Sequence, residues 1–301
     1  THNHVVSLRP SMGDRCISTV DLANLAAGLV VLRQSVPSLA ARASALLNAM
    51  EWDWLYDANV GLMYGCRFPD GSASDWHYDW LAADSRLAYV FAIGTDRIPA
   101  AAWNKLNRDH EPPRCVSADV WHFDPGWDGG GLFMAFLPAL FVDEAESELG
   151  TSARNFVLDY ICFAKQKGAP AWGQSATALP PFGKEYFGYG ELRDEIIVPH
   201  ASLLAVESVG SGVLIDNLKA LEAMGARQAA TDGTNALDFG FRSSVNWKTG
   251  AVSTDYLVLD QSMVFLSLMN VPARGYTRRQ SCQDPIIRAA IARIADYASS
   301  C

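Results

Sequence analysis

Apolar residues recur three and four positions apart in many segments of this chain, which is the spacing of one face of an α-helix. The first such segment is STVDLANLAAGLVVLRQS, where Ser18 and Asp21 form a capping-box pattern with Asp in place of Glu. Pro37 opens a second helix, so the two are expected to pair as a helical hairpin. Further helices are expected at 84–94, 99–108, 131–142, 151–168, 200–208, 212–225, 255–270 and 285–299.

Strand patterns are scarce. The segment WDWLYDANVGLMYG has aromatic and apolar residues on both sides of the turn residues Asp57 and Gly61, which predicts a small β-hairpin near residues 53–65. Because no strands alternate with the helices, a parallel α/β sheet is disfavoured. We therefore expect an all-α fold, with antiparallel helix pairs arranged around a common axis as an (α/α)6 toroid.

Composition and charge narrow the classes of protein. The 301 residues are 50% hydrophobic and 19% charged, with no linker-like stretch, so residues 1–301 are expected to form a single domain. A net charge of −9 argues against nucleic acid as a partner, since phosphate backbones are bound by clustered Lys and Arg. Apolar runs such as 25–32 and 132–142 are too short to span a bilayer.

The six cysteines show neither CxxC nor Cys/His ligand spacing, so no metal site is expected. Their even number permits disulfides in an oxidising compartment, where Cys282 and Cys301 could fasten the last helix. The loop in WDGGGLFMAF lacks the Lys-Ser or Lys-Thr that a phosphate-binding loop requires. No nucleotide or flavin motif is present either, and the expected cofactor is none.

Several ordered motifs resemble one bacterial group. The opening block STVDLANLAAGLVV, the segment LAADSRLAYVFAIGTDRIPAAAWNKLNRD and the run GGGLFMAFLPALF are followed by AWGQSA, VPHASLLAV, FGFRSSV and YLVLDQSM. In this order they are similar to the glucoamylase-like domains, which include the endo-β-1,2-glucanases of glycoside hydrolase family 144 and relatives in cyclic β-1,2-glucan synthases. The resemblance implies the (α/α)6 toroid. It also implies that this chain starts after the first helices of that fold, so an N-terminal segment is expected to be missing or separately encoded.

Glycoside hydrolysis needs one carboxylic acid to protonate the leaving oxygen and a second carboxylate to activate water or attack the sugar. The resemblance assigns Asp84 as the proton donor and matches Asp21 and Asp260 to acids of the family. It also places Met134 where the family has a glutamate and Ser243 where it has an aspartate. Asp128 at the head of the glycine run can replace the lost glutamate, and Glu185 and Glu191 are further alternatives.

Each of these acids also has a simpler interpretation. Asp21 satisfies amide donors at a helix start, Asp84 caps a helix or pairs with Arg86, and Asp260 is hydrogen-bonded inside the core. His200 after Pro199 can be a helix cap. The sequence leaves both interpretations open.

Aromatic residues favour a carbohydrate cleft, because their rings stack on the apolar faces of sugars while polar side chains bind the hydroxyls. The predicted sugar-binding residues are Trp80, Arg86, Trp121, His122, Trp127, Trp172, Gln174, His200 and Gln261.

The sequence therefore predicts a glycoside hydrolase acting on a β-glucan, specifically an endo-β-1,2-glucanase. A non-catalytic glycan-binding or scaffold domain is the first alternative, and a phosphorylase or transglycosylase is the second. An oligo- or polysaccharide is the expected partner, together with a missing N-terminal segment or a companion chain. The expected location is periplasmic or secreted.

Overall fold

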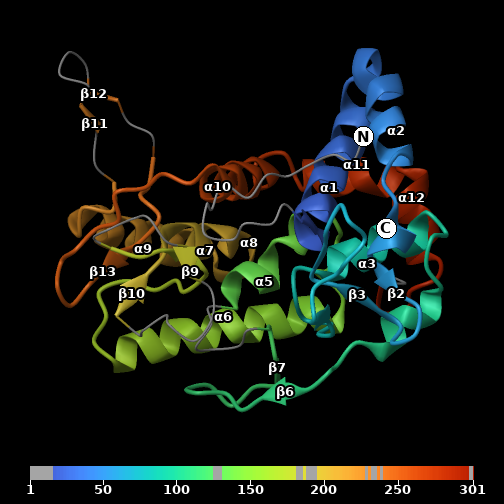
Figure 1. The fold of residues 1–301 in the computed structure, drawn as a ribbon. Helices are drawn as coiled ribbons and strands as arrows, with labels where there is room; N and C mark the ends of the chain where they lie inside the picture. Colours follow the sequence, from blue (N-terminus) through green and yellow to red (C-terminus); the bar gives the residue numbers. More distant parts are fainter. Residues whose placement is uncertain are drawn as a thin grey trace. The chain divides into compact units, whose positions relative to one another are not determined.

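A computed structural model describes residues 16–124, 131–180, 186–187, 195–227, 230–231, 236–237, 240–297 and 301. Helices dominate this part of the chain (Figure 1). The chain divides into two compact units. Unit 1 comprises Thr1–Arg108, Phe141–Ser147 and Thr277–Cys301, and unit 2 comprises Asp109–Leu140 and Glu148–Tyr276. That residues 1–301 form a single domain stays a prediction.

Unit 1 is built on helices that the apolar periodicity predicts. Its helical elements are α1 (Thr19–Ser35), η1 (Pro37–Leu39), α2 (Ala40–Asn48), η2 (Trp52–Leu55), α3 (Arg86–Gly94), η3 (Ala100–Lys105), most of α11 (Tyr276–Gln283), α12 (Pro285–Ile291) and η5 (Ala295–Tyr297). The Ser18 hydroxyl accepts the Asp21 N–H at 3.3 Å, so Ser18 is the N-cap of α1. Helix α1 packs against α2, which confirms the helical hairpin, and α3 packs against both α1 and α12.

Two small antiparallel sheets complete unit 1. The strands β1 (Ile17–Ser18) and β4 (Cys66–Arg67) form one sheet, and β2 (Tyr56–Asp57), β3 (Leu62–Tyr64) and β5 (His77–Tyr78) form the other in the order β2-β3-β5. Tyr56 pairs with Met63, so the predicted hairpin is present. Large side chains with almost no exposed surface fill the core, among them Trp52, Leu55, Met63, Tyr89, Phe91, Trp103 and Tyr297.

Unit 2 is helical as well. Its helical elements are α5 (Leu132–Phe136), η4 (Pro138–Leu140), α6 (Glu148–Gln166), α7 (Pro199–Leu204), α8 (Val206–Val209), α9 (Ser211–Ala223) and α10 (Val258–Asn270). Helix α5 packs against α6 and α7, while α7 also packs against α9 and α10 (Figure 1). Its antiparallel strand pairs are β6 (His110–Glu111) with β7 (Val120–Trp121), β8 (Thr177–Ala178) with β9 (Tyr186–Phe187), β10 (Ile196–Ile197) with β13 (Val245–Asn246), and β11 (Ala230–Thr231) with β12 (Ala236–Leu237).

Several predicted helices are not continuous α-helices. The segment 200–208 divides between α7 and α8, and 285–299 divides between α12 and η5. The segment 131–142 forms α5 and then the separate 3₁₀ turn η4, because Pro138 has no N–H to continue the α-helical hydrogen bonds. The segment 99–108 forms the 3₁₀ helix η3 after Pro99. The mainly helical prediction is confirmed, and a strictly all-α fold is corrected by the small antiparallel sheets.

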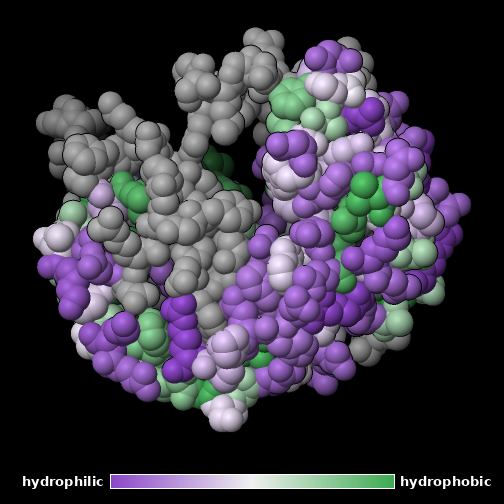
Figure 2. Space-filling model, turned by 60° about the horizontal axis from the view of Figure 1, so that its bottom comes forward, coloured by the Kyte–Doolittle hydropathy of each residue, from purple (hydrophilic) through white to green (hydrophobic). Residues whose placement is uncertain are grey.

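Disulfide bonds fasten both units. Cys282 and Cys301 are joined, a pairing that the sequence permitted. Cys16 is bonded to Cys66 within unit 1, and Cys115 is bonded to Cys162 within unit 2. Among the residues that are coloured in Figure 2, hydrophobic ones form separate patches between hydrophilic ones on this face. Among the described residues, no helix combines the length and apolar character needed to cross a membrane.

Candidate functional site

The predicted site residues fall in both units. Asp21, Trp80, Asp84 and Arg86 belong to unit 1, whereas Trp121, His122, Trp172, Gln174, His200, Asp260 and Gln261 belong to unit 2. Asp128 and Trp127 lie outside the described residues, as do Glu185 and Glu191.

In unit 1, Asp84 lies in the turn before α3, and 9% of its surface is exposed. The neighbouring Arg86 is fully buried, and its Nε and Nη2 each donate to the Glu144 carboxylate at 2.8 Å. Its Nη1 donates to the Ala83 carbonyl at 2.8 Å, and the Tyr297 hydroxyl donates to Glu144 at 2.7 Å. This network anchors the turn that carries Asp84.

Burial disfavours the charge on Arg86, but the attraction and hydrogen bonds of Glu144 outweigh it and raise the pKa of Arg86. With no exposed surface, its guanidinium is placed to position the turn, and its sugar contact stays a prediction. Asp21 is exposed in the first turn of α1, and Trp80 is half-buried beside Asn107. Their roles also stay predictions.

In unit 2, motifs far apart in the sequence meet. Asp260 in the first turn of α10 accepts a hydrogen bond from the Ser243 hydroxyl at 2.8 Å, and its other oxygen lies 3.3 Å from His200 Nδ1 on α7. The Ser243 hydroxyl is also 2.9 Å from Thr177 Oγ1 and accepts the Ala178 N–H at 3.2 Å. The FGFRSSV, VPHASLLAV and YLVLDQSM blocks thus build one buried polar cluster with the residues just after AWGQSA.

This cluster is closed to water but not fully hydrogen-bonded. His200 and Asp260 are each 2% exposed. Among the described residues, neither the ring nitrogens of His200 nor Oδ1 of Asp260 have a hydrogen-bond partner. Buried polar groups of this kind require an explanation, because desolvation without a partner is costly. A carboxylate in these surroundings is held in place by Ser243, which occupies the position where the resemblance expects an aspartate.

Trp172 and Gln174 lie next to this cluster on the segment that precedes β8. Each is 6% exposed. The Trp172 backbone exchanges two hydrogen bonds with the Asn217 side chain, and Gln174 Oε1 accepts the Tyr160 hydroxyl at 2.6 Å. Gly173 between them has a φ of +131°, and a Cβ there would lie 2.7 Å from the Val198 carbonyl oxygen, so only glycine allows this approach.

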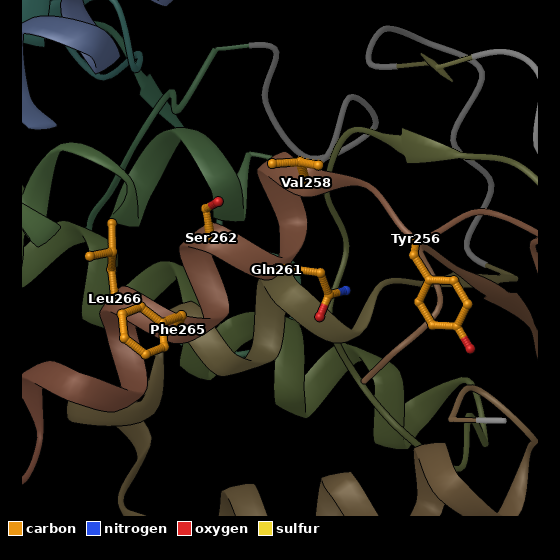
Figure 3. A pocket seen from close by; sticks show the side chains of 6 residues that line it. All are labelled: Tyr256, Val258, Gln261, Ser262, Phe265 and Leu266. Carbon is orange, nitrogen blue, oxygen red and sulfur yellow. The ribbon is translucent and has the colours of Figure 1, made fainter. Parts of the chain in front are cut away.

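An open pocket of about 770 Å³ lies at the start of α10 in unit 2 (Figure 3). Its lining residues are Tyr256, Val258, Gln261, Ser262, Phe265 and Leu266. Figure 3 shows Gln261 between the rings of Tyr256 and Phe265. The Gln261 amide donates to the Phe241 carbonyl at 2.8 Å, which fixes its orientation.

The pocket volume is in the usual range for small-ligand sites, and two aromatic rings with an amide and a hydroxyl suit a sugar. Sequence reasoning selected Gln261 but missed Tyr256, Ser262 and Phe265. The signal for Ser262 and Phe265 was helical spacing, since they follow Val258 on one face of α10, whereas Tyr256 precedes this helix.

Trp121 and His122 occupy the β6–β7 ribbon. Trp121 is 6% exposed, and its ring packs on His110 with centroids 5.4 Å apart. His122 lies between two carboxylates, with Nδ1 2.6 Å from Glu111 and Nε2 3.6 Å from Asp124. Hydrogen bonding to Asp124 and Glu111 raises the pKa of His122 to about 9. This acid–histidine–acid arrangement was not predicted from the sequence, because only the pairing of β6 with β7 brings Glu111 to His122.

Met134, at the position of the family's glutamate, is buried in α5 with 7% of its surface exposed. Within the described part of the chain, no group of His, Cys, Asp and Glu side chains is arranged to hold a metal ion.

Comparison with known proteins supports the resemblance. No family model matches this chain. The cyclic β-(1,2)-glucan synthase NdvB of Rhizobium meliloti is 28% identical over 274 residues, which are 86% of this chain but 9% of the synthase. The chain is thus homologous to a small part of a much longer protein.

Solved structures share the fold. An endo-β-1,2-glucanase from Chitinophaga pinensis, in complex with sophorotriose and glucose, superposes with a TM-score of 0.75 at 17% identity, over 92% of this chain and 71% of that one. A β-1,2-glucanase from Parabacteroides distasonis gives 0.70 at 14% identity, over 92% of this chain and 44% of that one. A protein from Bacteroides caccae described as a glucoamylase gives 0.72 at 18% identity, over 92% of this chain and 71% of that one. The chain therefore has the fold of the glucoamylase-like proteins, among them endo-β-1,2-glucanases.

Proposed function

We propose that this chain is a glycoside hydrolase domain that acts on β-glucan, and specifically an endo-β-1,2-glucanase. The observation that carries the proposal is the fold shared with the Chitinophaga pinensis endo-β-1,2-glucanase over 92% of this chain. Homology to part of a cyclic β-(1,2)-glucan synthase points to the same linkage. Fold alone does not fix activity, so the side chains must supply the chemistry.

In the proposed mechanism, Asp84 protonates the leaving oxygen and a second carboxylate, Asp128, positions water. The buried Arg86–Glu144 pair supports the role of Asp84, because it fixes the turn that carries this carboxyl group without covering it completely. A positioned acid and a positioned base are what this chemistry needs. The (α/α)6 toroid is proposed as the fold class.

Glucan binding is proposed at the pocket at the start of α10. Tyr256 and Phe265 would stack on pyranose rings, while Gln261 and Ser262 bind hydroxyls. Among the described residues that line it, none is an acid, so the pocket is proposed to bind sugar away from the bond that is cleaved.

A non-catalytic glycan-binding domain is the second candidate, favoured by one specific observation. The two positions where the resemblance expects acids carry Met134 and Ser243, and the remaining family acid nearby, Asp260, is 2% exposed and hydrogen-bonded to Ser243. A site with this composition holds sugar without supplying the second carboxylate.

Product analysis separates the two candidates. The chain is incubated with β-1,2-, β-1,3-, β-1,4- and α-glucans, alongside Asp84→Asn and the matched control Asp216→Asn, whose carboxylate is exposed on α9. Oligosaccharides from the β-1,2-glucan alone, lost in Asp84→Asn and retained in Asp216→Asn, are the expected result. Binding by calorimetry without any product would instead support the glycan-binding domain.

The proposed location is periplasmic or secreted. Disulfides persist in oxidising compartments, and the structure joins all six cysteines in pairs. Association with a further segment or a companion chain stays a prediction.

A further inference from the structure

Trp76 in unit 1 is a large aromatic residue that the proposed catalysis does not use. It lies just before β5, and 48% of its surface is exposed. Of the tryptophans in the described chain, it alone is among the exposed large hydrophobic residues. Single exposed hydrophobic side chains are common at protein surfaces, so what distinguishes this indole is how firmly it is held.

The indole is held firmly in spite of its exposure. Its six-membered ring lies against Gly65, where a Cβ would collide with it. The Tyr78 ring packs edge-on against it, with centroids 5.0 Å apart and planes at 81°. The Trp76 carbonyl accepts the Gly65 N–H at 3.2 Å and the Ser74 hydroxyl at 2.8 Å. Backbone and ring are therefore fixed before any ligand arrives, which lowers the entropic cost of binding.

The Trp76–Tyr78 pair suits a sugar ring. The two residues are two positions apart at β5, so their side chains project from the same face of the strand. A rigid pair of aromatic rings matches a pyranose, whose C–H face is apolar. A protein partner would favour a broader apolar patch than these two rings offer.

We propose that Trp76 and Tyr78 form a secondary binding surface for a β-glucan chain, separate from the pocket on α10. The surface engages one sugar ring by stacking and holds long chains on the enzyme. It rests on the proposed function for the identity of the glycan. Since a single stacking contact is weak, its effect appears with polymer, where several contacts act together.

The experiment measures binding of linear β-1,2-glucan polymer and of a β-1,2-linked trisaccharide by calorimetry, with product formation from each. We expect Trp76→Ala to weaken polymer binding about fivefold to tenfold, the loss of one aromatic contact. Trisaccharide binding and cleavage stay unchanged. Trp76→Phe retains most of the affinity, since it keeps a ring.

Two further variants test the geometry. Gly65→Ala leaves Trp76 in the chain but displaces its ring, so it too is expected to weaken polymer binding. Ile215→Ala removes an equally exposed hydrophobic side chain, 49% exposed on α9, and should change nothing. Circular dichroism melting verifies that each variant is folded.

The outcomes separate the two proposals. If the wild type and Trp76→Ala bind the polymer equally well, the secondary binding surface is overturned, and the proposed function stays intact. If the wild type binds no β-glucan, then β-glucan is not the ligand, and both the proposed function and the secondary surface are overturned. If Trp76→Ala differs from the wild type only in the mass measured by sedimentation, the surface binds a protein, and the proposal is overturned.

Discussion

Ser243 shows how one residue changes the chemistry of a buried site. The resemblance expects an aspartate there, which would set a second carboxylate against Asp260 and raise the pKa of one of them. In this chain the Ser243 hydroxyl instead donates to Asp260 at 2.8 Å. A serine thus converts an acid pair into a single, hydrogen-bonded carboxylate.

Removal of this hydroxyl should be costly. Ser243→Ala leaves a buried carboxylate oxygen and the Ala178 N–H without a partner, and we expect the free energy of unfolding to fall by about 1–3 kcal/mol. Urea denaturation measures the change. Ser267→Ala on α10 is the control, because it removes a hydroxyl that donates to the Leu203 carbonyl and leaves no carboxylate unpaired. Equal losses in both variants would contradict the argument.

His122 gives the molecule a pH-dependent contribution to stability. Its pKa is raised from 6.5 to about 9 in the folded state, so folding favours the protonated ring. The stabilisation is therefore complete below about pH 6.5 and is lost as the pH rises through about 9. We expect wild type and His122→Gln to differ most in unfolding free energy at pH 6 and to converge near pH 10.

His110→Gln provides the comparison for this pH series, because His110 lies on the same ribbon but pairs with the exposed Asp119. Glu111 and Asp124 are the charged groups that contact His122. A difference between wild type and His122→Gln that stays constant from pH 6 to pH 10 would show that the two carboxylates do not stabilise the imidazolium.

At the scale of elements, helix ends fix how α12 meets α1. Asp284 is the N-cap of α12, accepts the Ile286 N–H at 3.0 Å, and also accepts hydrogen bonds from Arg33 and from Gln34 at the end of α1. It is completely buried. One carboxylate therefore closes a helix and joins two helices that are 250 residues apart in the chain.

Asp284→Ala should accordingly cost far more than the loss of an ordinary cap. We expect a decrease of about 3–5 kcal/mol in unfolding free energy, since Arg33 loses its partner in a largely buried place. Ser18→Ala, which removes the single hydrogen bond capping α1, should cost about 1 kcal/mol. Denaturant titration of both variants measures the contrast, and similar losses would mean that the link to α1 contributes nothing.

At the scale of the whole molecule, disulfides restrict the unfolded chain. Cys115–Cys162 closes a loop of 47 residues and Cys282–Cys301 one of 19. Loop-closure entropy predicts stabilisations of about 4 and about 3 kcal/mol. Replacing each pair by serine should therefore lower the melting temperature, more for the first pair. Calorimetry measures both, and melting of wild type that is insensitive to a reducing agent would contradict the expectation.

Local patterns predicted much of the secondary structure. Helices α1, α2, α6, α9 and α10 and the β2–β3 hairpin follow from apolar spacing, caps and turn residues, because these depend on neighbours in the sequence. The segments 99–108 and 131–142 were predicted less well. The first forms a 3₁₀ helix, and in the second Pro138 ends α5 and begins the 3₁₀ turn η4. The order of the motifs also indicated the glucoamylase-like fold that the comparisons support.

The sequence by itself determined the helical character, the likeness to β-glucan-processing proteins and the two departures at Met134 and Ser243. Only the tertiary structure decided which side chains meet. Arg86 and Glu144 are 58 residues apart and Ser243 and Thr177 are 66 apart, yet each pair is in direct contact. Such contacts arise from the packing of whole elements, which no local periodicity encodes. For the same reason, only the folded chain shows that the Trp76 ring is exposed and that it lies against Gly65.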